Sequence, residues 1–196
     1  MNRMLRTVIT AAATMLFLSG CSTLQEVANL RKVDFGIDAL TDLRIAGVQA
    51  SGVNSYDDLG ALDIVRIGAA VSRRELPVSF VLDVVARNPE ENNVQARMVS
   101  MAWTLLLEDR ETISGVFEEE VVIPSGETRH LPIRMELDLI SFFEGNARDL
   151  VDIALSLAGE SGEAKNVKLR AVPTVQTMLG PVRYPEPITI ISTTIG

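Results

Sequence analysis

Residue types that do acid–base or metal chemistry are sparse in this sequence, so the candidate sites are few. His130 is the only histidine, and the alternation around it places it on the polar face of a strand. A lone histidine that faces solvent is typical of a surface residue, and we expect no catalytic role for it. Glu118 and Glu120 should share one face of a strand, with Glu119 opposite. That pair could hold a cation, but like charges on an exposed strand more often deter edge-to-edge pairing.

Two other chemically capable groups have simpler structural explanations. Asp57 and Asp58 are better explained as negative charge at the start of a helix than as a pair of metal ligands. Trp103 lies in an apolar stripe, which favours core packing over stacking on a ligand. The sequence contains no Gly-x-Ser-x-Gly elbow and no phosphate-cradling glycine loop. We therefore predict a protein that is not an enzyme and that uses no cofactor or metal.

Cys21, the only cysteine, is the residue whose context predicts a covalent modification. Arg3 and Arg6 precede an apolar run over residues 8–18, which is too short to span a bilayer comfortably. The run ends in Leu18-Ser19-Gly20-Cys21, which resembles the bacterial lipoprotein signal. This resemblance implies cleavage before Cys21 and transfer of a diacylglyceryl group to its thiol. The alternative is an ordinary secretory signal followed by a chance cysteine.

Lipidation at Cys21 would divide the chain into three parts. Residues 1–20 would be the signal peptide, residues 21–32 a lipid-anchored tether, and residues 33–196 the folded domain. A lipoprotein carries more than one acyl chain, and two or more are what stable anchoring requires. Ser22, rather than an aspartate, follows the cysteine, which by resemblance to Gram-negative lipoproteins indicates the outer membrane. We expect a periplasm-facing protein of the cell envelope.

The composition limits the class of the domain and its partners. The 196 residues are 47% hydrophobic with a mean hydropathy of +0.22, which excludes a hydrophilic, disordered protectant. The length fits one domain with a substantial core. The formal net charge of −8 becomes −10 when Arg3 and Arg6 leave with the signal peptide. So acidic a surface repels phosphate backbones, and we expect no nucleic-acid partner. One cysteine also permits no internal disulfide.

The elements that must position these residues are mainly strands, most clearly the segment Leu76–Arg87. Its alternation of apolar and polar residues predicts a half-buried strand. Asn88-Pro89 should end that strand, because proline cannot donate a hydrogen bond to the ladder. The buried face of the strand is expected to hold Val78, Phe80, Leu82, Val84 and Ala86.

Three further strands are expected to follow through short turns, over about residues 94–107, 113–123 and 130–139. Pro132 within the last one argues for an edge strand. Four antiparallel strands with short hairpins predict half of a β-sandwich. The first of the three strands should bury Val99, Met101, Trp103, Leu105 and Leu107, and the last should bury Leu131, Ile133, Met135, Leu137 and Leu139.

The flanking segments add a first strand with an irregular middle over residues 33–51, and last strands over 168–177 and 183–194 across Gly180-Pro181. Two helices are also expected. Ser55 and Asp58 form a capping-box-like pair that should start the first helix, and Asn146 should cap the second. The apolar stripes of the two helices are expected to be Leu59, Leu62, Val65 or Arg66, Ala69 and Ala70 in the first, and Leu150, Ile153, Ala154 and Leu157 in the second.

The block from about Leu76 to Ile195 resembles the late embryogenesis abundant type 2 family, also called the water-stress and hypersensitive-response domain. The residues that carry the resemblance are Asn88-Pro89, the Trp103 strand, Ser114-Gly115, Ile123-Pro124, Val172-Pro173-Thr174, Gly180-Pro181 and Ile188–Ile191. Glu90-Glu91, inserted before Asn92, depart from the pattern. The resemblance implies a mainly β, fibronectin III- or immunoglobulin-like antiparallel sandwich, here with two inserted or flanking helices. It also implies a non-enzymatic protein associated with desiccation and other stresses.

Three functions remain open at this point. The first is a lipid-anchored envelope protein whose sandwich is a non-enzymatic binding or protective module, in desiccation or osmotic stress, with another envelope protein as its partner. The second is an accessory structural subunit of an envelope or transport complex. The third, an enzyme using carboxylates, is disfavoured because the sequence offers no nucleophile with its base.

Overall fold

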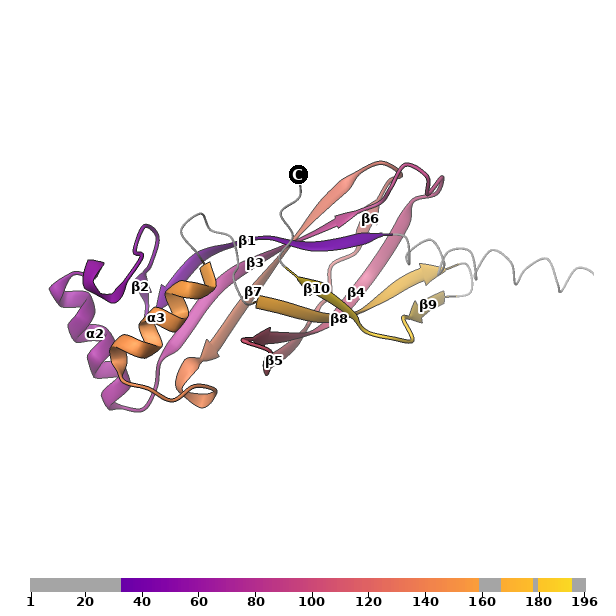
Figure 1. The fold of residues 1–196 in the computed structure, drawn as a ribbon. Coiled ribbons are helices and arrows are strands. Elements are labelled where there is room, and N and C mark those ends of the chain that lie inside the picture. Colours follow the sequence, from indigo (N-terminus) through magenta and orange to yellow (C-terminus); the bar gives the residue numbers. More distant parts are fainter. Residues whose placement is uncertain (1–32, 159–166, 178–179, 192–196) are drawn as a thin grey trace, which may run out of the picture.

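The computed structural model describes residues 33–158, 167–177 and 180–191, which form two facing antiparallel sheets with two helices at one end (Figure 1). Cys21, with the whole of the predicted signal peptide and tether, lies outside the described residues. Among the described residues, no helix is long and apolar enough to cross a membrane.

The first sheet has the strand order β2-β1-β3-β7, and every neighbouring pair in it is antiparallel. Ala46 and Gly47 both have positive φ and join the first two strands in a two-residue hairpin of the kind that suits the strand twist. The strands of this sheet are β1 (Asp34–Ile45), β2 (Val48–Gln49), β3 (Pro77–Arg87) and β7 (Thr128–Asp138).

The second sheet has the order β10-β8-β4-β5, also antiparallel, with two short strands added along it. Strand β6 pairs with the start of β4, and β9 pairs with the end of β8. The strands of this sheet are β4 (Ala96–Leu107), β5 (Arg110–Phe117), β6 (Val121–Ile123), β8 (Val167–Thr177), β9 (Gly180–Arg183) and β10 (Ile188–Ile191).

The mainly β sandwich predicted from the sequence is confirmed. The order β1-β3-β7 facing β10-β8-β4-β5 means that the chain changes sheets between β3 and β4, and again between β6 and β7. The expectation that the central four strands form one half of the sandwich is therefore wrong. Their alternation marks a face that packs inward, and both sheets of a sandwich have such a face. Strand β7 lies at an edge of its sheet, as Pro132 predicted.

The buried face of β3 is the predicted one, but the face of β4 differs at its start. The pairing of β4 with β8 shifts register between Met98 and Ser100, so the extra residue of a bulge moves the alternation by one position. Ala96 and Met98 are consequently buried, and Val99 is only half-buried. From Met101 onward the predicted buried positions are correct.

Two predicted strands are each broken into two. The segment 113–123 divides into β5 and β6, both paired with β4, with Glu118–Glu120 outside either strand. Of the last expected strand, 183–194, Arg183 ends β9 and residues 188–191 form β10, both paired with β8, while residues 192–194 lie outside the described residues. Gly180-Pro181 lies within β9 rather than in a turn before it.

Trp103 and the inward row of β7 belong to one hydrophobic core, and they enter it from opposite sheets. Trp103 is only 9% exposed. It pairs across the strands with Gly115, where a Cβ atom would lie 2.4 Å from Cζ2 of the indole. Glycine at this position therefore leaves the space that the ring occupies, and the prediction that Trp103 serves packing is confirmed.

Asn88 ends β3 as a fully buried polar residue, at 0% exposure. Its Nδ2 donates hydrogen bonds to the carbonyl oxygens of Val94 (3.0 Å) and Ile123 (2.9 Å). Its Oδ1 accepts one from Nδ2 of Asn92 at 2.6 Å. The side chain thus ties the polar loop after β3 to β6, across the change of sheets.

The first helical insertion begins with the predicted cap and then departs from the predicted stripe. Asp58 Oδ2 accepts hydrogen bonds from the backbone N–H of Ser55 at 3.0 Å and from its hydroxyl at 3.2 Å, which closes the capping box of the short helix η1 (Tyr56–Asp58). In α2 (Ala61–Ser72), however, Leu62 and Val65 are 76% and 67% exposed. The helix buries Ala70, as predicted, but it also buries Ile67, which lies about 140° around the axis from Leu62.

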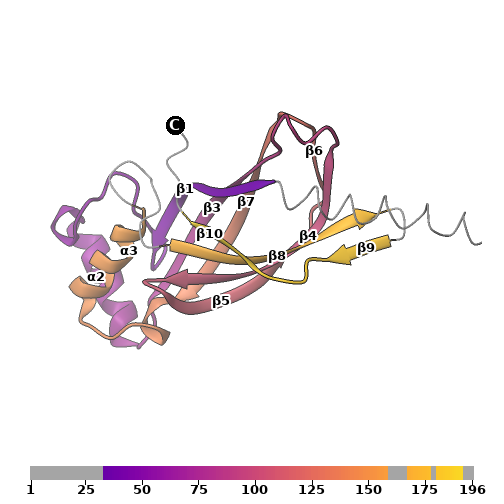
Figure 2. The same ribbon diagram turned by 45° about the vertical axis from the view of Figure 1, so that its right-hand side comes forward.

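The second helical insertion is closer to its prediction. Asn146 Oδ1 accepts from the backbone N–H of Asp149, whose Oδ2 accepts in return from the backbone N–H of Asn146. These reciprocal bonds cap α3 (Ala147–Ala158), which follows a short helix, η2 (Leu139–Ser141). The predicted Ile153 is only half-buried. Figure 2 shows both long helices together at the end of the sandwich away from β6 and β9. The buried positions of α3 are Leu150, Val151, Ala154, Leu155 and Leu157.

Candidate functional site

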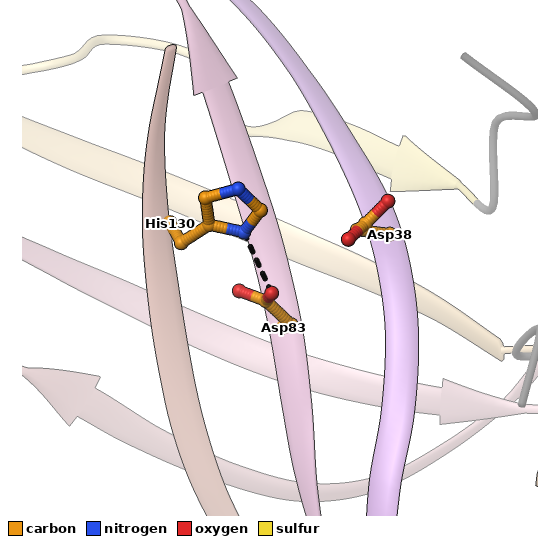
Figure 3. Close-up of side chains that lie close together, drawn as sticks. All are labelled: Asp38, Asp83 and His130. Carbon is orange, nitrogen blue, oxygen red and sulfur yellow. Dashed lines mark hydrogen bonds and ion pairs between the residues drawn. The ribbon is translucent and has the colours of Figure 1, made fainter. Parts of the chain in front are cut away.

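His130, Asp83 and Asp38 form a cluster on the outer face of the first sheet, one residue from each of β7, β3 and β1 (Figure 3). His130 Nδ1 lies 2.7 Å from Oδ2 of Asp83. One ligand-type atom from each of the three residues lies within 4.8 Å of the other two. The histidine that the sequence placed alone on a polar face therefore stands beside two carboxylates.

The strand pairing explains how these side chains meet. In the register of β3 with β7, His130 lies opposite Val85, so Asp83 is its diagonal neighbour on the same face. Asp38 joins the cluster because of a β-bulge in β1. Ile37 pairs with Val84 and Ala39 pairs with Asp83, so Asp38 between them is the extra, unpaired residue of the ladder. The bulge turns Asp38 outward without disturbing the buried positions on either side of it.

The cluster is open to solvent on one side and closed beneath. The side chains of His130 and Asp83 are 58% and 23% exposed. Val85, on the same outer face, is almost fully buried and is not part of the central core. Asp83 Oδ1 is buried and has no hydrogen-bond partner among the described residues. The cluster thus offers one imidazole nitrogen and two carboxylates, one of which has a buried oxygen without a hydrogen-bond partner among the described residues.

The glutamates expected to share a face of a strand do not do so. Glu118, Glu119 and Glu120 lie between β5 and β6, and all three are exposed. Glu120 is 3.5 Å from Nη1 of Arg97, a surface ion pair of the kind that contributes little. The predicted shared face is wrong because no continuous strand forms over 113–123, and these three residues lie in the break between β5 and β6.

Asp57 and Asp58 have the structural roles expected of acidic residues at a helix start, with one addition. Asp57 Oδ1 and Oδ2 accept hydrogen bonds from the guanidinium of Arg148 at 2.6 and 2.8 Å, which joins the first helical insertion to α3. These bonds hold the pKa of the Asp57 carboxyl below its ordinary value, although desolvation opposes the shift. The same guanidinium lies 4.7 Å from the centre of the Tyr56 ring.

His130 was predicted on the polar face of its strand, and Asp83 lies outside the predicted buried face of β3, but nothing in the sequence indicates that the two meet. The sequence does not show that β3 pairs with β7, because β4, β5 and β6 of the second sheet lie between them in the chain. Asp38 was missed for a different reason: the irregularity of the first strand was predicted, but not the position of its bulge.

Comparison with known proteins gives no family and only loose structural similarity. No family model and no curated protein matches the chain. A solved protein from Archaeoglobus fulgidus aligns with 61% of this chain and 88% of its own, at 12% identity and a TM-score of 0.31. A solution structure described as a late embryogenesis abundant protein aligns with 95% of this chain and 89% of its own, at 14% identity and a TM-score of 0.35. A β-glucosidase from Erythrobacter marinus aligns with 78% of this chain but 15% of its own, with a TM-score of 0.21.

Proposed function

We propose that this chain is a lipid-anchored protein of the bacterial cell envelope, attached through Cys21, whose β-sandwich is a non-enzymatic binding or protective module. The observation that carries the proposal is the position of the only cysteine, directly after a leader with two arginines and an apolar run. We place the domain in the periplasm, at the outer membrane, because Ser22 rather than aspartate follows the cysteine.

The packing of the domain supports a role that depends on a folded surface. Both sheets bury continuous apolar rows, and the change of sheets is held by the buried side chain of Asn88. A disordered protectant acts through an extended, hydrated chain, which this composition does not provide. Protection during drying or osmotic upshift must therefore come from binding, and another envelope protein is the partner we propose.

Deletion of the gene, followed by drying or osmotic upshift, tests this function. We expect the deletion strain to survive less well than its parent and the wild-type gene to restore survival. Cys21→Ser should restore survival poorly, because the domain is no longer held at the membrane. Unchanged survival of the deletion strain would overturn the protective role, and full rescue by Cys21→Ser would overturn the need for the anchor.

A second candidate, an accessory structural subunit of an envelope or transport complex, is favoured by the outer face of α2. Leu62 and Val65 project from adjacent turns of this helix and are largely exposed, whereas Ile67 faces the domain. Detergent extracts of membranes should then return a stoichiometric partner with the wild-type chain. Leu62→Ser with Val65→Ser should release that partner, and Val116→Ser, an exposed valine on β5, should retain it. Failure to recover any stoichiometric partner would exclude this candidate.

A further inference from the structure

We propose that Asp38, Asp83 and His130 bind one divalent transition-metal ion, with Zn²⁺ as the ion that tests the site. The site is independent of the lipid anchor, because all three residues belong to the sandwich. It is assembled from three adjacent strands, so the backbone positions of its ligands are fixed by the pairing of the sheet (Figure 3).

The spacing of the three side chains suits a small ion. In a tetrahedral zinc site with bonds of about 2.1 Å, neighbouring ligand atoms are about 3.4 Å apart. Here the ligand atoms lie within 4.8 Å of one another, and His130 Nδ1 is already 2.7 Å from Asp83 Oδ2. Side-chain rotations that move the atoms by about an ångström would complete the geometry. Two of the three residues, Asp38 and His130, are exposed and have room for such rotations.

The set of donor atoms indicates the class of ion. Calcium and magnesium prefer sites made of oxygen ligands, whereas an imidazole nitrogen with carboxylates suits zinc and its neighbours in the first transition series. Three protein ligands leave a fourth position for water, as in open zinc sites. Two carboxylates would also balance the charge of a divalent ion.

Asp83 gives independent support for a cation at this place. Its Oδ1 is buried without a hydrogen-bond partner among the described residues, so one lone pair of a desolvated carboxylate is unused. Within the described part of the chain, neither Asp38 nor Asp83 forms an ion pair with a lysine or arginine, although Asp57 elsewhere does. An ion pair between His130 and Asp83 alone would use only Oδ2 of Asp83. It would explain neither the unpaired, buried Oδ1 of Asp83 nor the position of Asp38 beside the pair.

Calorimetric titration with Zn²⁺ of the full chain carrying Cys21→Ser, in neutral detergent, tests the proposal without a competing thiol. We expect saturable binding of one ion per chain and a higher Tm in excess Zn²⁺, because an ion that binds only the folded state stabilises it. His130→Ala and Asp38→Asn should each lower the affinity by roughly tenfold or more. Asp83→Asn should do the same.

The control is Glu136→Gln, which removes one carboxylate from the same outward face of β7, about 20 Å along the strand from His130. It should bind Zn²⁺ as the parent does. No saturable binding by the parent would overturn the proposal. It would also be overturned if His130→Ala retained full affinity, or if His130→Ala lost it while both aspartate variants kept it, since a single surface histidine would then account for the binding.

Discussion

The strongest structural prediction concerns Asn88, which is buried where the chain changes from one sheet to the other. Asn88→Ala removes two donated hydrogen bonds, to the carbonyl oxygens of Val94 and Ile123, and one accepted from Asn92. At about 1 kcal/mol for each bond, the free energy of unfolding should fall by about 3 kcal/mol. Asn88→Asp keeps the size but turns an acceptor toward two carbonyls, so it should cost at least as much as the alanine variant at neutral pH.

Urea unfolding of residues 33–196, followed by the fluorescence of Trp103, measures this change, because Trp103 is the only tryptophan. The control is Asn93→Ala, an exposed asparagine in the same loop, which should change stability by less than about 0.5 kcal/mol. A loss below 1 kcal/mol for Asn88→Ala, or an equal loss for Asn93→Ala, would refute the idea that the Asn88 side chain stabilises the connection between the two sheets.

Four further changes test other parts of the structure. Trp103→Ala should cost about 3–5 kcal/mol in urea unfolding followed by circular dichroism, and a loss under about 1 kcal/mol would place the indole at the surface. Gly115→Ala should cost about 1–3 kcal/mol in the parent and almost nothing in the Trp103→Ala background, because its Cβ would overlap the indole; equal costs in both would contradict that contact. Glu108→Asn should stabilise by roughly 0.5–1 kcal/mol, since residue 108 has a φ of +49° in an exposed turn and asparagine tolerates the left-handed region better; a loss of stability would argue against that conformation. The bond from Arg148 lowers the pKa of Asp57, so its contribution is complete above the ordinary aspartate pKa and is lost as pH falls through the lowered value. An NMR titration should find the Asp57 pKa below its ordinary value in the parent and higher in Arg148→Gln, and identical values would refute the link.

The sequence predicted those features that depend on local pattern. Alternation identified the buried face of β3, and Pro132 identified β7 as an edge, because both signals act within a single strand. The capping pair of Ser55 with Asp58 and the cap at Asn146 were likewise predicted, since each acts within three residues of its partner.

The remaining features depend on pairing between distant segments. The shift at Val99 and the bulge at Asp38 each insert one residue into a ladder, and neither changes the composition of its strand. The predicted stripe of α2 was wrong at Leu62 and Val65, which are apolar yet face outward, away from the domain that buries Ile67 and Ala70. The candidate cluster at His130 was missed because its three residues come together only in the observed register of three strands.

Metabolic labelling with a palmitate analogue tests the proposed attachment at Cys21 most directly. Cells that make the wild-type chain should incorporate the label into this protein, and the labelled form should fractionate with the outer membrane. Cys21→Ala should carry no label and should remain uncleaved or appear in the soluble fraction. Equal labelling of the wild-type and Cys21→Ala chains would contradict the account of a lipid-anchored envelope protein.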